Sequence, residues 1–309
     1  MTDVAICVAT CRRPRGLRRT LASLAALETE RDVAVVVADN DAEGQEGVAA
    51  AEALRRAGYR WPLVAMTVAE RGIPQVRNAL VRTALALPHV RFVAMLDDDE
   101  AAEPGWLRAM LACQAATRAD VVGGAVLRAL EGEVPRWAAA HPLLQPKSRG
   151  ESGVVPLIDS TANVLIAAEA LRATGDAPFD EAMALTGGSD KQLFTRMQRA
   201  GRRFAWAEDA RVTELIPASR ITAGWLLMRG YRIGMTDMIT AMTHDGALRA
   251  ARAEAHRIVG GLVVGSLGAA LTLDRGKRIV RLGRAYRAAG KVAALAGRRY
   301  EEYRKVHGA

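Results

Sequence analysis

Residues 91–107 read RFVAMLDDDEAAEPGWL, an apolar run that ends in four consecutive carboxylates. The apolar half predicts a buried strand, and the segment after it, which has an early proline, predicts a helix. Four adjacent carboxylates repel one another, so a cation or a partner must compensate their charge. An acidic turn at the start of a helix is the alternative, and it accounts for Glu103 better than for three aspartates in a row.

Clustered oxygen ligands suit a hard divalent cation, and Mg²⁺ is normally held by one or two carboxylates together with substrate phosphates. In extended backbone, residues two apart point to the same side, so Asp97 and Asp99 are predicted to face the same partner. Asp98 is predicted to point elsewhere, toward a ribose hydroxyl. The stretch therefore predicts a metal and nucleotide site at the end of a strand.

Strand-like and helix-like segments alternate on both sides of this stretch. Strands are predicted at 4–10, 32–40, 61–68, 90–97 and 120–127, and helices at 16–27, 47–58, 73–87 and 103–116. This alternation predicts a mostly parallel sheet with helices on both faces. Such sheets collect their chemistry beyond the carboxyl ends of the strands, where Thr10, Asp39 and Asp97 lie.

The second half of the chain is less regular. Residues 131–158 carry four prolines and predict a long loop or a lip over a cleft. The elements expected beyond it are a strand at 160–168, a helix at 189–201 with Ser189 as its cap, and short strands near 204–206 and 211–215. The rest is predicted to be helical, which gives an α/β domain at 1–215 and a helical region at 216–309.

The composition is that of a globular protein. The chain has 309 residues, half of them hydrophobic, enough for one large domain or a domain with an appendage. Its cysteines, Cys7, Cys11 and Cys113, are odd in number and lack zinc-ligand spacing, so we expect the reduced thiols of a cytosolic protein. The first residues enter a predicted strand without the basic and apolar regions of a signal peptide.

Positive charge is concentrated near the C-terminal end. Residues 1–245 hold 29 Lys and Arg against 30 Asp and Glu, whereas residues 246–309 hold 14 against 4. A basic segment of this kind predicts an acidic partner, either anionic lipid or nucleic acid. A solvated helix face is the plainer alternative.

Residues 258–273 form a run of 16 without charge, which is shorter than a membrane-spanning helix of roughly 20 apolar residues. Two interpretations stay open: a core helix with close-packing glycines, or a segment lying shallowly in a membrane interface. Basic residues flank the run and favour the membrane slightly; they are Arg249, Arg252, Arg257, Arg275, Lys277 and Arg278.

Five motifs occur in order along the chain: CVATCRRP, VVVADNDAE, IPQVRNALV, LDDDEAAEPGWL and GGSDKQLFTRM. In this order and at these spacings they resemble the family 2 glycosyltransferases of the GT-A fold, and among them the bacterial exopolysaccharide-type members. The resemblance covers residues 4 to about 235 well and the remaining tail loosely. It implies an α/β fold of the GT-A type, with a Rossmann-like, mostly parallel central sheet and flanking helices, followed here by a C-terminal helical extension.

The resemblance also implies roles for individual residues. The nucleotide-sugar donor would be bound by Thr10, Arg13, Asp39, Arg77, Asp97 and Asp98. The cofactor, Mn²⁺ or Mg²⁺, would be bound by Asp99 and Asp97. Asp190 would be the catalytic base, and Ser189 stands where the family usually has the first acid of an acidic pair. Trp225 and Arg229 share a helix face and are candidates for contact with the acceptor or the pyrophosphate.

Plainer roles stay open for several of these residues. Asp39 could cap a turn, and Arg77 could pair with an acid on a neighbouring element. Asp190 lies in the first turn of a helix, and its carboxylate could simply stabilise that helix by interacting with the helix dipole. Trp225 could pack in the core.

The implied activity is inverting transfer of a sugar from a nucleotide diphosphate sugar to an acceptor hydroxyl. The donor would be a UDP-sugar, which is the common donor in this family. The acceptor would be a lipid-linked saccharide of exopolysaccharide or cell-surface glycan synthesis. The enzyme would be cytoplasmic and peripheral on the inner face of the cytoplasmic membrane, held by roughly 1 kcal/mol for each Lys or Arg near the anionic surface. No nucleic acid partner is expected.

Rival functions are distinguished by what they would require. A sugar-nucleotide pyrophosphorylase needs a Gly- and Arg-rich loop after the first strand, where this chain has ATCRRPRG with little glycine. A dehydrogenase needs G-x-G-x-x-G at that place. A nucleic-acid-binding protein would leave the acidic cluster unexplained. The remaining alternative is a basic-tailed scaffold derived from a glycosyltransferase, because Ser189 replaces an acid.

Overall fold

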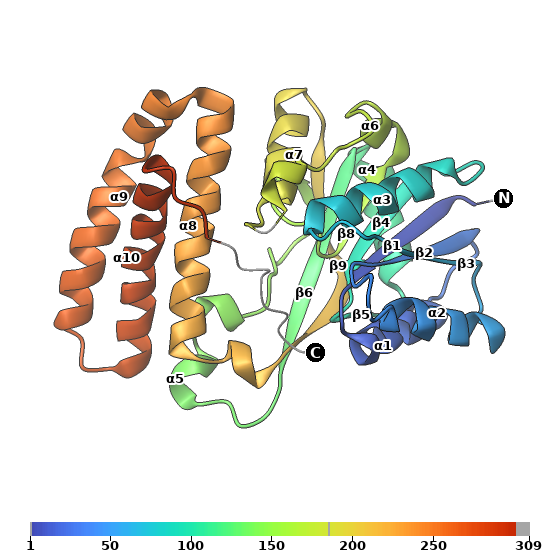
Figure 1. Cartoon of the computed structure of the whole chain (residues 1–309), viewed down its shortest axis with the longest axis horizontal. Helices are drawn as coiled ribbons and strands as arrows, with labels where there is room; N and C mark the ends of the chain where they lie inside the picture. Colours follow the sequence, from blue (N-terminus) through green and yellow to red (C-terminus); the bar gives the residue numbers. More distant parts are fainter. Residues whose placement is uncertain (1, 185, 301–309) are drawn as a thin grey trace.

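The structure is a computed structural model that describes residues 2–184 and 186–300 (Figure 1). Its strands form one sheet in the spatial order β3-β2-β1-β4-β8-β6-β9-β5, and β7 also pairs with β9. The strands are β1 (Val4–Thr10), β2 (Val33–Asp39), β3 (Leu63–Thr67), β4 (Phe92–Asp97), β5 (Glu100–Ala102), β6 (Val121–Leu130), β7 (Gly153–Val155), β8 (Val164–Ala167) and β9 (Phe204–Ile216).

Helices cover both faces of the sheet and continue beyond it. The helices are α1 (Pro14–Ala25), α2 (Glu46–Arg56), α3 (Ile73–Ala86), α4 (Trp106–Thr117), α5 (Arg136–Ala139), α6 (Ala168–Arg172), α7 (Ser189–Arg199), α8 (Ala223–Asp245), α9 (Ala247–Ala270) and α10 (Arg275–Leu295). Short 3₁₀ turns occur at η1 (Pro142–Leu144), η2 (Glu181–Met183) and η3 (Ala218–Arg220).

Strand β1 shows why this sheet is buried on both sides. Its side chains alternate between two cores: Val4, Ile6 and Val8 join one, and Ala5 and Cys7 join the other. Helices α1, α2 and α4 pack on the first core, and helices α3, α6 and α7 on the second. The continuous apolar sequence of β1 follows from this double burial, and the predicted α/β architecture is confirmed.

The sheet has a parallel part and a mixed part. Strands β3, β2, β1 and β4 are all parallel neighbours, whereas β8 runs antiparallel to both β4 and β6. The prediction of two short strands after residue 203 is wrong, because β9 is one strand of 13 residues. Its register against β6 shifts near Glu208 and Asp209, and these polar residues made the sequence look broken there. The short strand β5 was not predicted.

Residues 131–158 are mostly irregular, as expected, but they are not a free loop. Ala138 and Leu144 form a small apolar cluster with Ile216, Ile221 and Leu226. The cluster joins this segment to the start of α8. It therefore anchors the helical region to the end of β9.

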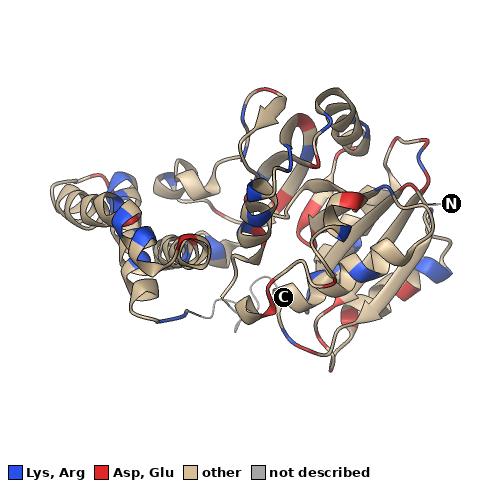
Figure 2. Ribbon diagram, turned by 90° about the horizontal axis from the view of Figure 1, so that it is seen from above, with Lys and Arg blue, Asp and Glu red and all other residues tan. Residues whose placement is uncertain are grey.

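After β9 the described chain contains only helices, and α8, α9 and α10 form a bundle at one side of the sheet (Figure 1). Glycines let these helices touch. A Cβ on Gly234 of α8 would lie 1.8 Å from the carbonyl oxygen of Arg287, and one on Gly290 of α10 would lie 2.0 Å from that of Tyr231. The Lys and Arg of these helices are visible in Figure 2, with few Asp and Glu among them.

Helix α9 has close-packing glycines on one face and exposed apolar side chains on the other, and its contact with a membrane interface stays a prediction. Gly261, Gly265 and Ala269, four residues apart, lie on the face that meets α10. The other face is open to solvent and apolar: its exposed side chains are Val259, Leu262, Val263, Val264 and Leu267. One stripe is thus a close-packed glycine face, and the other is an apolar surface without a partner in the described chain.

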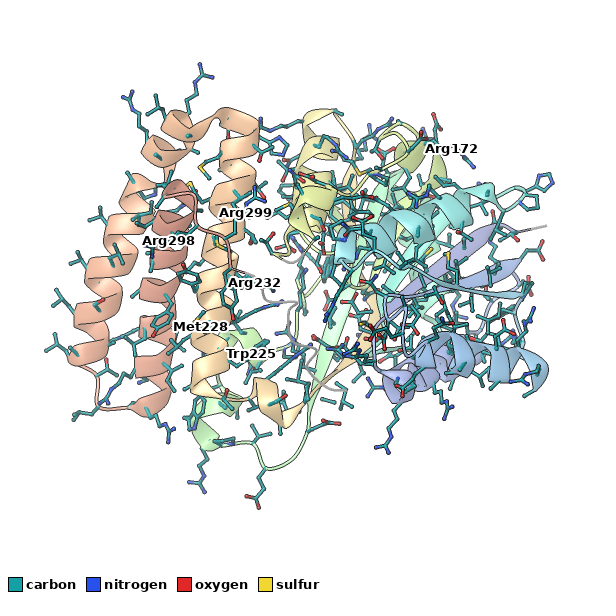
Figure 3. All side chains as sticks on the ribbon, in the orientation of Figure 1. Arg172, Trp225, Met228, Arg232, Arg298 and Arg299 are labelled. Atoms are coloured by element: carbon teal, nitrogen blue, oxygen red, sulfur yellow. The ribbon has the colours of Figure 1, made fainter. Side chains whose placement is uncertain are left out.

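No helix within residues 2–184 and 186–300 is long and apolar enough to cross a membrane. The last part of the predicted basic region, 301–309, lies outside the described residues. Figure 3 shows Trp225 and Arg232 on the side of α8 that faces the α/β part, and Arg232 is buried there.

Candidate active site

Three strand ends meet at one edge of the sheet, as the topology predicted. The register pairs Thr10 of β1 with Asp39 of β2, and Ala9 with Asp97 of β4. Parallel strands carry their carboxyl ends to the same edge, so these polar residues are neighbours although they are far apart in sequence.

The backbone turns immediately after Asp97, and this corrects the prediction for the acidic stretch. Strand β4 ends at Asp97, and residues Asp98 and Asp99 form a turn before β5. The argument from extended backbone therefore does not apply to Asp97 and Asp99, although both carboxylates lie at this edge of the sheet. Gly16 of α1 allows the close approach of this turn, since a Cβ there would lie 2.6 Å from the carbonyl oxygen of Asp98.

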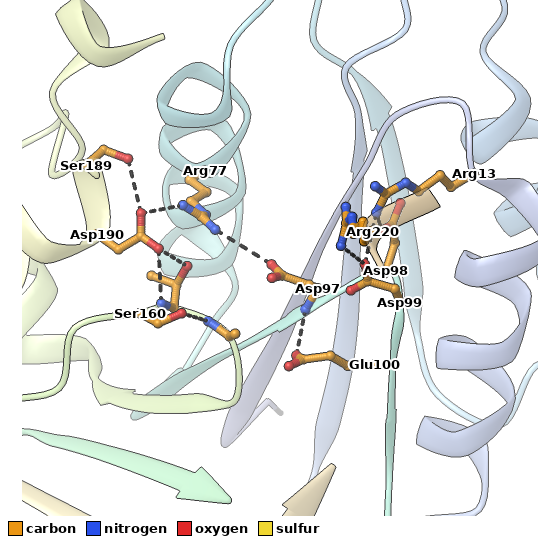
Figure 4. A network of polar contacts seen from close by, with 12 residues as sticks. Arg13, Arg77, Asp97, Asp98, Asp99, Glu100, Ser160, Ser189, Asp190 and Arg220 are labelled. Carbon is orange, nitrogen blue, oxygen red and sulfur yellow. Dashed lines mark hydrogen bonds and ion pairs between the residues drawn. The ribbon is translucent and has the colours of Figure 1, made fainter. Parts of the chain in front are cut away.

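Arginines from three separate elements compensate the aspartates (Figure 4). The Arg13 guanidinium lies 3.0 Å from an Asp98 oxygen and 3.1 Å from an Asp99 oxygen. Arg220 of η3 lies 3.5 Å from Asp99, and Arg77 of α3 lies 3.6 Å from Asp97. The predicted donor-binding residues Arg13 and Arg77 are thus at the acidic edge. Arg220 is a member of the site that the sequence analysis missed.

Asp98 is the most enclosed of the three aspartates. It is 4% exposed, and it accepts a hydrogen bond of 2.8 Å from the Thr10 hydroxyl. Burial, together with the neighbouring Asp99 carboxylate, raises the pKa of Asp98 to about 6 although Arg13 and Thr10 oppose the rise. The contact with Thr10 ties the ends of β1 and β4 together.

Glu100 has a structural role beside the site. It is 1% exposed, and its carboxyl accepts a hydrogen bond of 3.0 Å from the Asp97 backbone amide. Burial and the nearby Asp97 carboxylate raise the pKa of Glu100 well above its ordinary value. The raised pKa favours the neutral form of Glu100, and that form lessens the repulsion among the four acids.

Arg77 joins the acidic edge to the predicted base. One of its nitrogens lies 2.8 Å from an Asp190 oxygen, and another lies 3.6 Å from Asp97. The plainer role that was left open for Arg77, pairing with an acid of another element, is therefore observed here. It does not separate Arg77 from the site, because both of its carboxylate partners belong to the predicted site.

Asp190 lies in the first turn of α7 and has several donors. Its other oxygen accepts hydrogen bonds from the Thr161 amide and hydroxyl, at 3.3 and 3.2 Å. Burial by itself would raise the pKa of Asp190, but the Arg77 guanidinium and the bonds from Thr161 outweigh it, so the pKa lies below its ordinary value. Asp190 is thus ionised at neutral pH, as a proton acceptor must be.

Ser189 does not cap α7, which corrects that prediction. Gly188, with a φ of +94°, occupies the position before the helix, and Ser189 is its first helical residue. The Ser189 hydroxyl lies 3.4 Å from an Asp190 oxygen. The residue that replaces the family's usual acid is therefore another donor to Asp190, as is Thr161, which the sequence analysis did not single out.

Asp39 serves the local backbone in this structure. It has no exposed surface, and its carboxylate accepts hydrogen bonds from the backbone amides of Asp41 and Gly47, at 3.0 and 2.8 Å. Gly47 is the second residue of α2, so Asp39 holds the start of that helix. This is the capping role that was left open, and contact with a nucleotide base stays a prediction.

Trp225 and Arg229 are connected to the acidic edge through Arg220. Two guanidinium groups lie near the centre of the Trp225 ring, that of Arg220 at 5.8 Å and that of Arg229 at 5.7 Å. Both distances are in the range of cation–π contacts. Trp225 also packs against the apolar cluster at the start of α8, so it has the core contact that was the alternative.

The protein's own ligands fit a divalent cation only in part. Across the part of the chain that the structure describes, no three His, Cys, Asp or Glu side chains converge as a complete metal site. Asp97, whose side chain is 42% exposed, and Asp99 offer two carboxylates. That donor set suits Mg²⁺ or Mn²⁺ held jointly with the phosphates of a nucleotide.

A cavity of about 970 Å³ reaches Asp99 from the side of α1. Basic residues of the β1–α1 turn and of α1 contribute to its lining, namely Arg12, Arg13, Arg15 and Arg19. Four acidic residues line it as well, namely Asp41, Glu46, Asp99 and Glu131, so the charges of its walls are balanced.

Comparison with known proteins bears on the fold and the family. The model of the family "Glycosyl transferase family 2" matches residues 5–172, a range that includes the acidic edge but not Asp190. The succinoglycan biosynthesis protein ExoM of Rhizobium meliloti (strain 1021) is 33% identical over 239 residues, which covers 76% of this chain and 73% of that protein.

Solved structures share the architecture at low identity. The mannosyltransferase PcManGT from Pyrobaculum calidifontis, in complex with GDP-Man and Mn²⁺, has a TM-score of 0.63 at 16% identity and covers 96% of this chain and 89% of its own. S. aureus TarS 1-349 in complex with UDP has a TM-score of 0.54 at 14% identity, with coverages of 97% and 93%. These likenesses show the fold. The family match and the relative show more: the chain belongs to glycosyl transferase family 2, with a GT-A fold and the sequence character of its exopolysaccharide-type members.

Proposed function

We propose that this glycosyltransferase moves a sugar from a nucleotide diphosphate sugar to an acceptor hydroxyl, with inversion at the anomeric carbon. The observation that carries the proposal is the chain of contacts from Asp97 through Arg77 to Asp190. It connects an edge suited to a diphosphate with an ionised carboxylate suited to take a proton.

In the proposed reaction the acceptor oxygen attacks the anomeric carbon while the bond from that carbon to the diphosphate breaks. Asp190 receives the proton of the acceptor hydroxyl. Its lowered pKa, which results from Arg77 and Thr161 acting against burial, keeps it unprotonated until the acceptor arrives. Attack from the side opposite the leaving group gives inversion.

The leaving diphosphate carries the developing negative charge. Arg13, Arg77 and Arg220 are the cations nearest to Asp97, Asp98 and Asp99, and we propose that they also contact the donor phosphates. Asp97 and Asp99 would hold Mn²⁺ or Mg²⁺, which supplies Lewis-acid stabilisation of the same charge. A UDP-sugar is the proposed donor. UDP and UDP-GlcNAc are bound in TarS structures and GDP-Man in that of PcManGT, so those three ligands come first in a donor screen.

The proposed acceptor is a lipid-linked saccharide of exopolysaccharide synthesis, which is supported by the likeness to ExoM. The exposed apolar stripe of α9 and the basic residues on both sides of it would hold the enzyme at the anionic inner face of the membrane. The stripe continues past the helix end, where Leu271 is 84% and Leu273 94% exposed.

The test is turnover by the purified chain with a panel of nucleotide sugars, Mn²⁺ and a saccharide acceptor, followed by NMR assignment of the product anomer. Asp190→Asn is expected to lower turnover by about 100- to 10,000-fold while donor affinity is unchanged. Product with retained configuration, or full turnover by Asp190→Asn, would contradict the proposed mechanism. Donor binding without transfer or hydrolysis would favour the scaffold alternative.

A further inference from the structure

A second cavity, of about 770 Å³, lies in the helical region. It is bounded by α7, α8, α9 and α10, and no residue of its lining belongs to the acidic edge. The residues that matter for its chemistry are Lys191, Arg199, Asp237, Thr240, His244, Asp245, Glu254, Arg257, Val264, Arg284, Arg287 and Lys291. We call it the bundle cavity.

The lining of the bundle cavity is basic. It contains six Lys and Arg and three Asp and Glu, a surplus of three positive charges. All three carboxylates are occupied. Asp237 pairs with Lys191 and Arg287, Asp245 pairs with Arg199, and Glu254 pairs with Arg257 and Lys291. Charge compensation by the protein's own acids is therefore incomplete, which favours an anionic ligand.

Two polar atoms of the lining lack hydrogen-bond partners among the described residues. The Thr240 hydroxyl is unpartnered although its side chain is only 4% exposed, and the Nε2 atom of His244 is likewise buried and unpartnered. A buried polar group without a partner costs free energy, so such groups usually indicate a missing ligand or water. Thr240 lies on α8 and lines the cavity, where its hydroxyl can donate a hydrogen bond to an oxygen atom of a ligand.

One wall of the bundle cavity is apolar and leads to the surface. Val264 lines the cavity and is also 62% exposed, within the apolar stripe of α9. Leu267, one helical turn further on, is 60% exposed. A ligand with a charged head and an apolar tail could place the head among the basic side chains and the tail along this stripe.

We propose that the bundle cavity binds the phosphate head group of an anionic phospholipid. The surplus positive charge and the unpartnered Thr240 hydroxyl receive the phosphate, and the open stripe of α9 receives the acyl chains. The inference rests on the membrane-surface part of the proposed function and is independent of the glycosyl-transfer chemistry. According to this proposal the lipid binds in one defined cavity, in place of a general attraction between basic residues and an anionic surface.

The site would also orient the enzyme. Lys191, Thr195 and Arg199 of the lining lie on α7, the helix whose first turn carries Asp190. A lipid held against α7 would therefore fix the candidate base relative to the membrane surface, where a lipid-linked acceptor is presented.

The experiment is calorimetric titration of the full chain with dihexanoylphosphatidylglycerol, below its micelle concentration, and in parallel with dihexanoylphosphatidylcholine and inorganic phosphate. The anionic lipid is expected to bind more tightly than both. Arg284→Glu, a charge reversal at an exposed lining residue, is expected to weaken binding by about tenfold or more. Thr240→Val keeps the side-chain shape, and it is expected to weaken binding several-fold without loss of thermal stability.

The matched control is Arg252→Glu, an exposed residue of α9 outside the cavity lining, which is expected to leave affinity unchanged. Equal weakening by Arg284→Glu and Arg252→Glu would overturn the site in favour of diffuse attraction. Equal affinity for inorganic phosphate would overturn the lipid as the ligand, and absence of binding would overturn both. Flotation with anionic vesicles is measured separately, so failure of surface association is distinguished from failure of the site.

Discussion

The α/β part and the helical part of this enzyme treat charge in opposite ways. At the acidic edge each aspartate has an arginine close by, supplied by Arg13, Arg77 or Arg220. In the helical part, basic side chains exceed acids, and an apolar stripe is left open beside them. The difference agrees with the two proposed tasks: in one region charges are balanced around the proposed donor site, and in the other a positive excess would attract an anionic partner.

Beside the loss expected from Asp190→Asn, the largest effect is expected from Asp99→Asn, which tests the balanced region. Loss of this carboxylate should remove the metal-dependent part of donor affinity and lower turnover by roughly 100-fold or more, since a metal supplies several kcal/mol of charge stabilisation. Donor titrations with and without Mn²⁺ measure the effect. Asp209→Asn, at a carboxylate that is 80% exposed on β9, is the control. An unchanged response of donor affinity to Mn²⁺ in Asp99→Asn would refute the metal role.

Arg77→Gln is expected to lower turnover by roughly 10- to 100-fold, the range for loss of a hydrogen bond to a charged group. It should also change the pH profile. Arg77 helps to hold the pKa of Asp190 below its ordinary value, so its removal lets burial raise that pKa. The base must be ionised, and the acid limb of kcat/KM is therefore expected to move to higher pH.

Arg82→Gln is the matched control for this prediction, because Arg82 is an exposed arginine on the same helix, α3. Its pH profile should superpose on that of the parent enzyme. An acid limb that stays in place in Arg77→Gln would show that Arg77 does not tune the base.

Gly234→Ala tests the packing of the helical region. The new Cβ would meet the Arg287 carbonyl oxygen at 1.8 Å, so α8 and α10 must move apart, and overpacking of this kind costs about 1–3 kcal/mol. The free energy of unfolding measures it. Gly283→Ala is the control, since nothing lies within 4 Å of its Cβ, and it should gain up to about 1 kcal/mol from helix propensity.

Leu267→Glu tests whether the open stripe of α9 meets lipid, and its effect is expected on vesicle binding alone. Transfer of a leucine side chain from water into lipid is worth about 1.5–3 kcal/mol. Its loss should weaken flotation with anionic vesicles by at least roughly tenfold, while turnover on a soluble acceptor is retained. Val154→Glu, at a residue 69% exposed on β7, is the control. If both variants float like the parent, the stripe does not contact the membrane.

Much of the fold was predictable because its pattern is local. Apolar β-branched runs alternate with amphipathic segments, so the parallel part of the sheet and the meeting of Thr10, Asp39 and Asp97 at one edge followed from topology. Strand β9 was less predictable, because its polar residues at the shift in register resemble a turn. The direction of Asp99 was missed because the extended-backbone rule ends where the strand ends.

The sequence by itself determined the family, the acidic edge and the excess of basic residues near the C-terminal end, since motif order, spacing and charge are properties of the chain. Only the tertiary structure decided which cation compensates each carboxylate. Arg13 reaches Asp98 across 85 residues, and Arg220 reaches Asp99 across 121. The folded structure also decided which stripe of α9 packs against α10 and which stays open. Contacts of this range depend on how strands and helices are stacked, and no local periodicity records that arrangement.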